Sequence, residues 1–95
     1  MQPLDLPPAV KTDPRSIEIA RVWAAHGGQH VTLNPHLWDD PGAWGVMLVD
    51  LARHVANAYE QLDGRERAET LARIKAAFEA EWDSPTDEAR GRMIG

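Results

Sequence analysis

The residues best suited to catalysis or ligand binding lie on one polar face of a predicted helix. They follow one another at i, i+3, i+4 and i+7, so their side chains are neighbours: Asp50, Arg53, His54 and Asn57. A carboxylate one turn before an imidazole can orient the ring and raise its pKa, as a general base or a pH-sensitive contact requires. We take these residues as the candidate ligand-binding site.

The same pattern also occurs on ordinary solvated helices, where Asp pairs with Arg or His at the surface. No nucleophile accompanies this face, because Ser16, Thr32 and Thr70 belong to other predicted elements. The sequence therefore assigns no catalytic residue.

Metal and cofactor chemistry finds little support. The histidines of the hairpin region, and the one on the helix, fit no familiar zinc-ligand spacing: His26, His30, His36 and His54. Gly27-Gly28 lacks the residues that surround a phosphate-binding loop, and a strand follows it. We predict no metal and no cofactor.

Four tryptophans could line an aromatic cavity, since indole offers a large flat apolar surface with one donor. They fall on or beside apolar stripes, except Trp38, which lies in a predicted loop: Trp23, Trp38, Trp44 and Trp82. We predict that they fill the core or a subunit interface.

The composition excludes several classes of function. Fifteen acidic and ten basic residues give a net charge of −5, which opposes binding to nucleic-acid phosphates. The longest strongly apolar run, Trp44 to Val49, is far shorter than the roughly 20 residues that span a bilayer, and no export signal is visible. With no cysteine there is no disulfide. We expect a cytoplasmic protein that binds neither nucleic acid nor membranes.

The period of the apolar residues changes once along the chain. It is close to two from Ser16 to Leu33, and three to four from Pro41 to Trp82. This predicts an α+β fold in the order ββαα, with strands over 17–25 and 29–33 and a first helix that runs to about Leu62. The second helix ends at Ser84-Pro85.

Gly27 and Gly28 are the predicted loop residues of the hairpin, which would pair Val22 with Leu33 and Ala24 with Val31. One sheet face then carries Val22, Ala24, Val31 and Leu33. The other carries Ile17, Ile19, Trp23 and Ala25 with Arg21, His30 and Thr32. Both faces are too apolar to be left to water.

No further strand is expected, and an isolated hairpin is marginally stable. We therefore predict a homodimer that covers the second face or an edge of the sheet, for example by joining two hairpins into four strands.

The first predicted helix carries two apolar stripes, more than one packing partner requires. The wider stripe comprises Trp44, Met47, Leu48, Leu51, Val55, Ala58 and Leu62. The narrower one comprises Gly45, Val49, Ala52 and Ala56. We predict that both helices pack on one face of the hairpin. Asp39-Asp40-Pro41 should start the first helix, and Asp63 with Glu66 resembles a capping box for the second.

Three segments follow from these elements. Residues 1–15 form a proline-rich extended arm, residues 16–83 a single α+β domain, and residues 84–95 a flexible tail.

Two stretches of the chain resemble a family of small bacterial proteins known as a domain of unknown function. They are Ala43-Trp44-Gly45 and the run from Leu48 to Ala56, preceded by Arg21-Val22-Trp23. The resemblance extends from about Ile17 to Asp87. It implies a stand-alone protein rather than a fragment of a known enzyme, and it transfers no site residues.

The sequence thus predicts an acidic, non-catalytic interaction module that works as a homodimer and binds a protein or a small ligand. The alternative is a small enzyme or ligand-binding protein that uses the polar helix face. A concave, water-accessible pocket around Asp50 and His54 would favour the alternative, and an open surface would favour the module.

Overall fold

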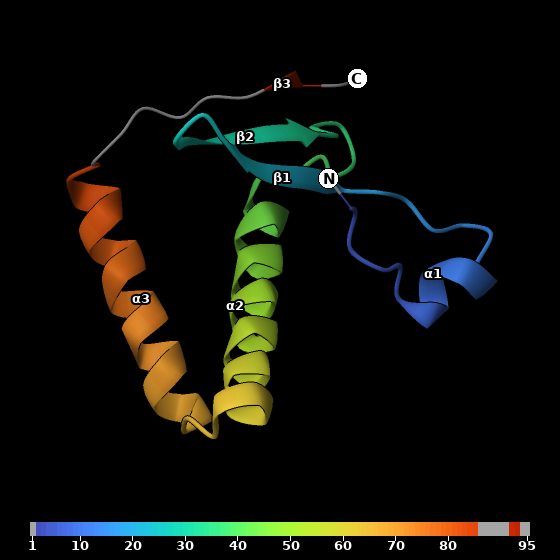
Figure 1. Cartoon of the computed structure of the whole chain (residues 1–95). Coiled ribbons are helices and arrows are strands. Elements are labelled where there is room, and N and C mark those ends of the chain that lie inside the picture. Colours follow the sequence, from blue (N-terminus) through green and yellow to red (C-terminus); the bar gives the residue numbers. More distant parts are fainter. Residues whose placement is uncertain (1, 86–91, 94–95) are drawn as a thin grey trace. The chain divides into compact units, whose positions relative to one another are not determined.

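The computed structural model describes residues 2–85 and 92–93. The elements follow in the order α1 (Pro8–Thr12), β1 (Ala20–Ala25), β2 (Gly28–Leu33), α2 (Gly42–Asp63), α3 (Arg67–Asp83) and β3 (Arg92–Met93) (Figure 1). An antiparallel hairpin followed by two long helices confirms the predicted ββαα fold class.

The chain divides into two compact units. One comprises Met1–Leu37 with Arg90–Gly95 and holds the sheet, and the other, Trp38–Ala89, holds the two long helices. The predicted packing of both helices on one face of the hairpin stays a prediction.

The turn between β1 and β2 consists of His26 and Gly27, with φ of 50° and 74°. Positive φ at both central residues is the mark of a type I′ turn, whose twist matches that of the flanking strands. The predicted Gly27-Gly28 loop was therefore wrong by one residue. Histidine tolerates the left-handed conformation better than most residues, which leaves Gly28 free to pair with Ala25 in the ladder.

The shift changes the cross-strand pairs but leaves the predicted faces intact. Val22 pairs with Val31 on one face, and Trp23 pairs with His30 on the other. His30 Nε2 lies 3.0 Å from the Ala25 carbonyl oxygen, so this imidazole closes the end of the hairpin.

A third strand, β3, pairs in parallel with the end of β2, with Thr32 opposite Arg92 and Leu33 opposite Met93. The expectation of no further strand was wrong. Two residues are too few to produce an alternating pattern that could be seen in the sequence. β2 is therefore the central strand of the order β1-β2-β3, and its pairing along this edge needs no second copy.

The N-terminal segment is not extended throughout. Pro8 begins the one-turn helix α1, where a proline without an N–H is tolerated, and the Val10 N–H donates to the Pro7 carbonyl at 3.0 Å. The prediction of an extended arm was wrong for these five residues. Leu4 is 94 % exposed.

The predicted start of α2 is confirmed. The Asp40 carboxylate accepts a hydrogen bond from the Gly42 N–H at 2.8 Å, and the Asp40 carbonyl accepts one from Ala43 at 3.0 Å. Pro41 lies between them with helical φ and ψ. A carboxylate here satisfies an amide that has no partner within the helix and lies at the positive end of its dipole.

Gly64 ends α2 with φ of 69°, and its N–H donates to the Glu60 carbonyl at 3.0 Å. Glu66, in extended conformation, precedes α3 without a side-chain cap. The predicted capping box was wrong because Asp63 is still the last residue of α2.

Within the helical unit, α2 and α3 form an antiparallel pair that is closest at the Gly64 bend and diverges away from it (Figure 1). Ala56 is fully buried, and Ala52, Leu71 and Ile74 are half-buried. The small residues of the narrower stripe therefore face α3 and let the two helices approach. The wider stripe of α2 stays largely exposed.

We expect Gly64→Ala to lower the free energy of unfolding by about 1 kcal/mol, because a Cβ is strained at positive φ. Gly64→Asn should lose less, since asparagine tolerates this conformation. Urea denaturation followed by circular dichroism measures both. Equal stability of the alanine variant and the wild type would contradict the left-handed conformation of Gly64.

The Arg21 guanidinium donates to the Glu18 carboxylate and holds the pKa of Glu18 below its usual value of 4.5. We expect Arg21→Gln to raise this pKa toward 4.5, as measured by NMR titration of the carboxyl carbon. Because the charged form is favoured in the folded state, any stabilisation is present above pH 4.5 and is lost on acidification. Arg15→Gln should leave the titration of Glu18 unchanged.

Candidate functional site

Asp50 and Arg53, two of the predicted site residues, form an ion pair on α2. Their nearest charged atoms, Asp50 Oδ1 and Arg53 Nη1, are 3.9 Å apart, and the side chains are 63 % and 65 % exposed. A pair this exposed and this long contributes little to stability. The Arg53 guanidinium therefore keeps its capacity to bind another anion.

Asn57 makes the polar contact that links the two helices. Its Oδ1 accepts a hydrogen bond from Arg67 Nη1 at 3.1 Å, and Asn57 is half-buried. The contact fixes the Arg67 guanidinium on the first turn of α3, while its other N–H groups are still able to donate.

A cavity of about 350 Å³ adjoins this contact. Its lining consists of two arginines, an amide and two apolar side chains: Arg53, Asn57, Arg67, Ala68 and Leu71. Two guanidinium groups beside an amide form an environment suited to a carboxylate or a phosphate.

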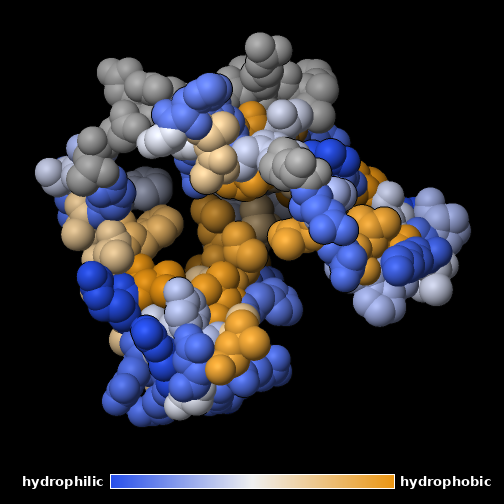
Figure 2. Space-filling view, viewed as in Figure 1, coloured by the Kyte–Doolittle hydropathy of each residue, from blue (hydrophilic) through white to orange (hydrophobic). Residues whose placement is uncertain are grey.

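A second cavity, of about 460 Å³, is the groove between the diverging helices. The apolar part of its lining comprises Gly45, Leu48, Val49, Ala52, Leu71, Ile74 and Phe78. The charged part comprises Arg53, Lys75 and Glu79. Lys75 Nζ lies 3.9 Å from Glu79 Oε1, so these two charges partly balance one another. In the space-filling view, hydrophobic surface gathers between the helices (Figure 2).

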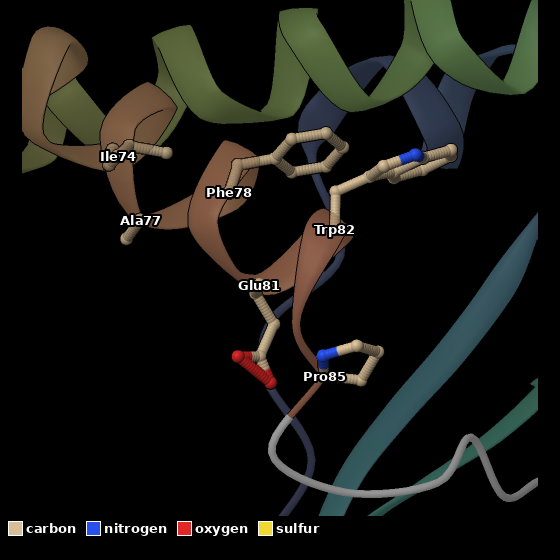
Figure 3. A pocket seen from close by; sticks show the side chains of 6 residues that line it. All are labelled: Ile74, Ala77, Phe78, Glu81, Trp82 and Pro85. Atoms are coloured by element: carbon tan, nitrogen blue, oxygen red, sulfur yellow. The ribbon is translucent and has the colours of Figure 1, made fainter.

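A third, open cavity lies near the C-terminal end of α3, with Phe78, Glu81 and Trp82 among its lining residues (Figure 3). The rings of Phe78 and Trp82 stack with centroids 5.7 Å apart and extend to the same side of α3. Trp82 is 74 % exposed, so it does not fill the core of this unit, and its predicted place in a subunit interface stays a prediction.

Trp38 packs on the first turns of α2. Its ring meets that of Trp44 edge to face, with centroids 5.1 Å apart, and both residues are half-buried. The loop tryptophan therefore belongs to the packed end of the helical unit.

The structure separates the four predicted site residues into two pairs. Arg53 and Asn57 line the polar cavity, whereas Asp50 and His54 do not line it or the groove. His54 is exposed, and the Asp50 carboxylate pairs with Arg53 instead of an imidazole. This face therefore provides cationic and amide donors to a ligand and no paired acid and base.

Arg67 is the candidate binding residue that reasoning from the sequence missed. Arg67 and Asn57 lie on opposite sides of the bend at Gly64. Because α3 runs antiparallel to α2, the first turn of α3 lies beside the last turns of α2. The sequence gives no simple signal for this contact, because Arg67 lies three residues after Gly64 whereas Asn57 lies seven residues before it.

Within residues 2–85, no group of three or more His, Asp or Glu side chains is arranged to hold a metal ion. In the same part of the chain, no helix combines the length and the apolarity needed to cross a bilayer.

Comparison with solved structures finds a chain that is 35 % identical, with a TM-score of 0.74, over 100 % of this chain and 97 % of the other. It is described as the "structure of a putative pyruvate dehydrogenase from the photosynthetic bacterium Rhodopseudomonas palustrus CGA009". No curated protein matches the chain.

A family profile covers residues 3–86, nearly the whole of the helical unit and the hairpin. Its description is a domain of unknown function, in agreement with the resemblance seen in the sequence. The chain belongs to the DUF5076 family.

Proposed function

We propose that this chain is a non-catalytic, cytoplasmic interaction module that works as a homodimer, in which α2 of one copy packs against α2 of the other. The observation that carries the proposal is the exposed apolar stripe of α2. Its four largest aliphatic residues are between 38 % and 83 % exposed: Leu48, Leu51, Val55 and Leu62.

The spacing of this stripe suits a helix–helix contact. Leu48, Leu51, Val55, Ala58 and Leu62 alternate steps of three and four residues, as the inward positions of a coiled coil do. At 100° per residue, the stripe is centred about 120° away from Ala56, which faces α3. α2 therefore has one apolar side for α3 and a second for another helix, the arrangement of a helix in a four-helix bundle.

The positions of the charged residues on α2 are also compatible with a helix–helix contact along the stripe. Five residues that lie on or beside this stripe carry no formal charge with histidine neutral: Met47, Ala52, His54, Tyr59 and Gln61. Of the charged residues of α2, Asp50, Arg53 and Glu60 lie farther around the helix, and Asp63 is its last residue. A second copy could thus cover the stripe without desolvating an ion pair, although each copy has a net charge of −5.

The energetics favour association of a chain this small. Full burial of one leucine or valine side chain contributes about 1.5 to 3 kcal/mol, and the stripe holds four that are partly exposed. Ala56 is the buried residue of the described part, so a single helical unit has a small core. Burying the stripe in a dimer would enlarge the apolar core.

An enzymatic role has less support. Asp50 and His54, the acid–base candidates, lie on an open surface, and the description of the neighbouring structure as a pyruvate dehydrogenase concerns that protein. Arg53 and Asn57 remain suited to ligand binding.

We expect Val55→Glu to convert the dimer to a monomer, because two like charges would meet where two helices pack. Val46→Glu is the matched control: Val46 is also on α2 and is 66 % exposed, but it lies outside the stripe. Sedimentation equilibrium measures both variants. A monomeric wild type at tens of micromolar, or a dimeric Val55→Glu variant, would contradict the proposal.

The thermal midpoint of the wild type should rise with protein concentration, because association stabilises the folded chain by mass action. The Val55→Glu variant should show no such dependence over the same range. Differential scanning calorimetry at several concentrations tests this, and a concentration-independent midpoint for the wild type would exclude a dimer coupled to folding.

A further inference from the structure

We propose that α2 and α3 together form a binding site for a small amphipathic anion. The anionic group, a carboxylate or a phosphate, would bind to Arg53 and Arg67, and the apolar tail would lie in the groove between the helices. The inference is independent of dimer formation.

The two arginines supply the anion site. Arg67 is oriented by its 3.1 Å hydrogen bond to Asn57 Oδ1 and keeps further N–H donors. Arg53 is held at 3.9 Å from Asp50, beyond hydrogen-bonding distance, so an incoming carboxylate competes with a weak partner. Both arginines line the same cavity of about 350 Å³, whose lining contains no acidic residue.

The groove supplies the apolar site. Its volume of about 460 Å³ lies within the range of small-molecule pockets, and most of its lining is aliphatic or aromatic. Arg53 and Leu71 belong to the linings of both cavities, so the polar cavity opens beside the groove. A ligand with an anionic end and an unbranched tail matches this order of surfaces.

The local charge selects the sign of the ligand. The chain as a whole is acidic, with a charge of −5, yet the polar cavity presents two guanidinium groups. Lys75 and Glu79 pair with one another at the groove and favour neither sign. A fatty amine would meet two like charges and a fatty alcohol would gain no ion pair.

The proposed site and the proposed dimer surface lie on different sides of α2. At 100° per residue, Arg53 and Val55 are about 160° apart around the helix, and Leu48 is the residue that both surfaces share. Loss of the dimer and loss of ligand binding can therefore be measured separately.

Isothermal titration calorimetry with decanoate, decyl phosphate, decylamine and decanol, each below its micelle concentration, tests the proposal. Decanoate or decyl phosphate should bind, and whichever binds more tightly identifies the preferred anionic group. Octanoate should bind about 16-fold more weakly than decanoate, since each buried methylene contributes about fourfold. Comparable binding of decylamine would overturn the proposal.

Variants locate the site. Arg53→Gln and Arg67→Gln should each weaken decanoate binding by about tenfold or more, the effect of losing a hydrogen bond to a charged group. Arg73→Gln, two residues beyond Leu71 and on another face of α3, is the matched control and should bind as the wild type does. Circular dichroism checks that each variant keeps its helices.

Methyl NMR supplies a readout that does not depend on variants. Decanoate should shift the methyl resonances of Val49 and Leu71, which line the groove, more than those of Leu62, which does not. Shifts confined to the α2 stripe would overturn the proposal.

A comparison with the monomeric Val55→Glu variant provides a further test. Decanoate binding to this variant but not to the wild type would overturn the proposal, since a second copy would then occupy the groove.

Discussion

The contact between the small residues of α2 and the apolar residues of α3 is the constraint on which the helical unit depends. Ala56 is fully buried and Ala52 is half-buried, so the backbones approach where side chains are smallest. The same contact brings Arg67 to Asn57 and opens the groove where the helices diverge. A larger residue at position 56 would displace all three features together.

This use of small residues decides which surface of α2 is left over. Because the narrow stripe is taken by α3, the large aliphatic residues remain exposed, which is unusual for side chains such as Leu51 and Val55. This exposed apolar face is the surface on which the proposed homodimer would form. The proposed homodimer and the proposed anion site use different sides of this arrangement.

The element types and their order could be predicted from the sequence, because the change of apolar period and the Asp40-Pro41 start are local signals. The details that depended on geometry could not. The one-residue error in the hairpin came from His26, whose positive φ has no strong composition signal, and β3 is too short for any periodicity. Of the candidate site, the helix face was predictable from spacing. Arg67 was not predictable, because its contact with Asn57 depends on how α2 and α3 cross and not on spacing within one helix.

The parallel pairing of β3 with β2 has a consequence for how the chain folds. Thr32 and Arg92 belong to one sheet, but the whole helical unit lies between them in sequence. During synthesis the hairpin and both helices leave the ribosome before Arg92 does, so the local elements can form first. The last ladder closes a long loop, and long-range closure is slow compared with helix formation. The sheet would accordingly be finished late, after the helices are already paired.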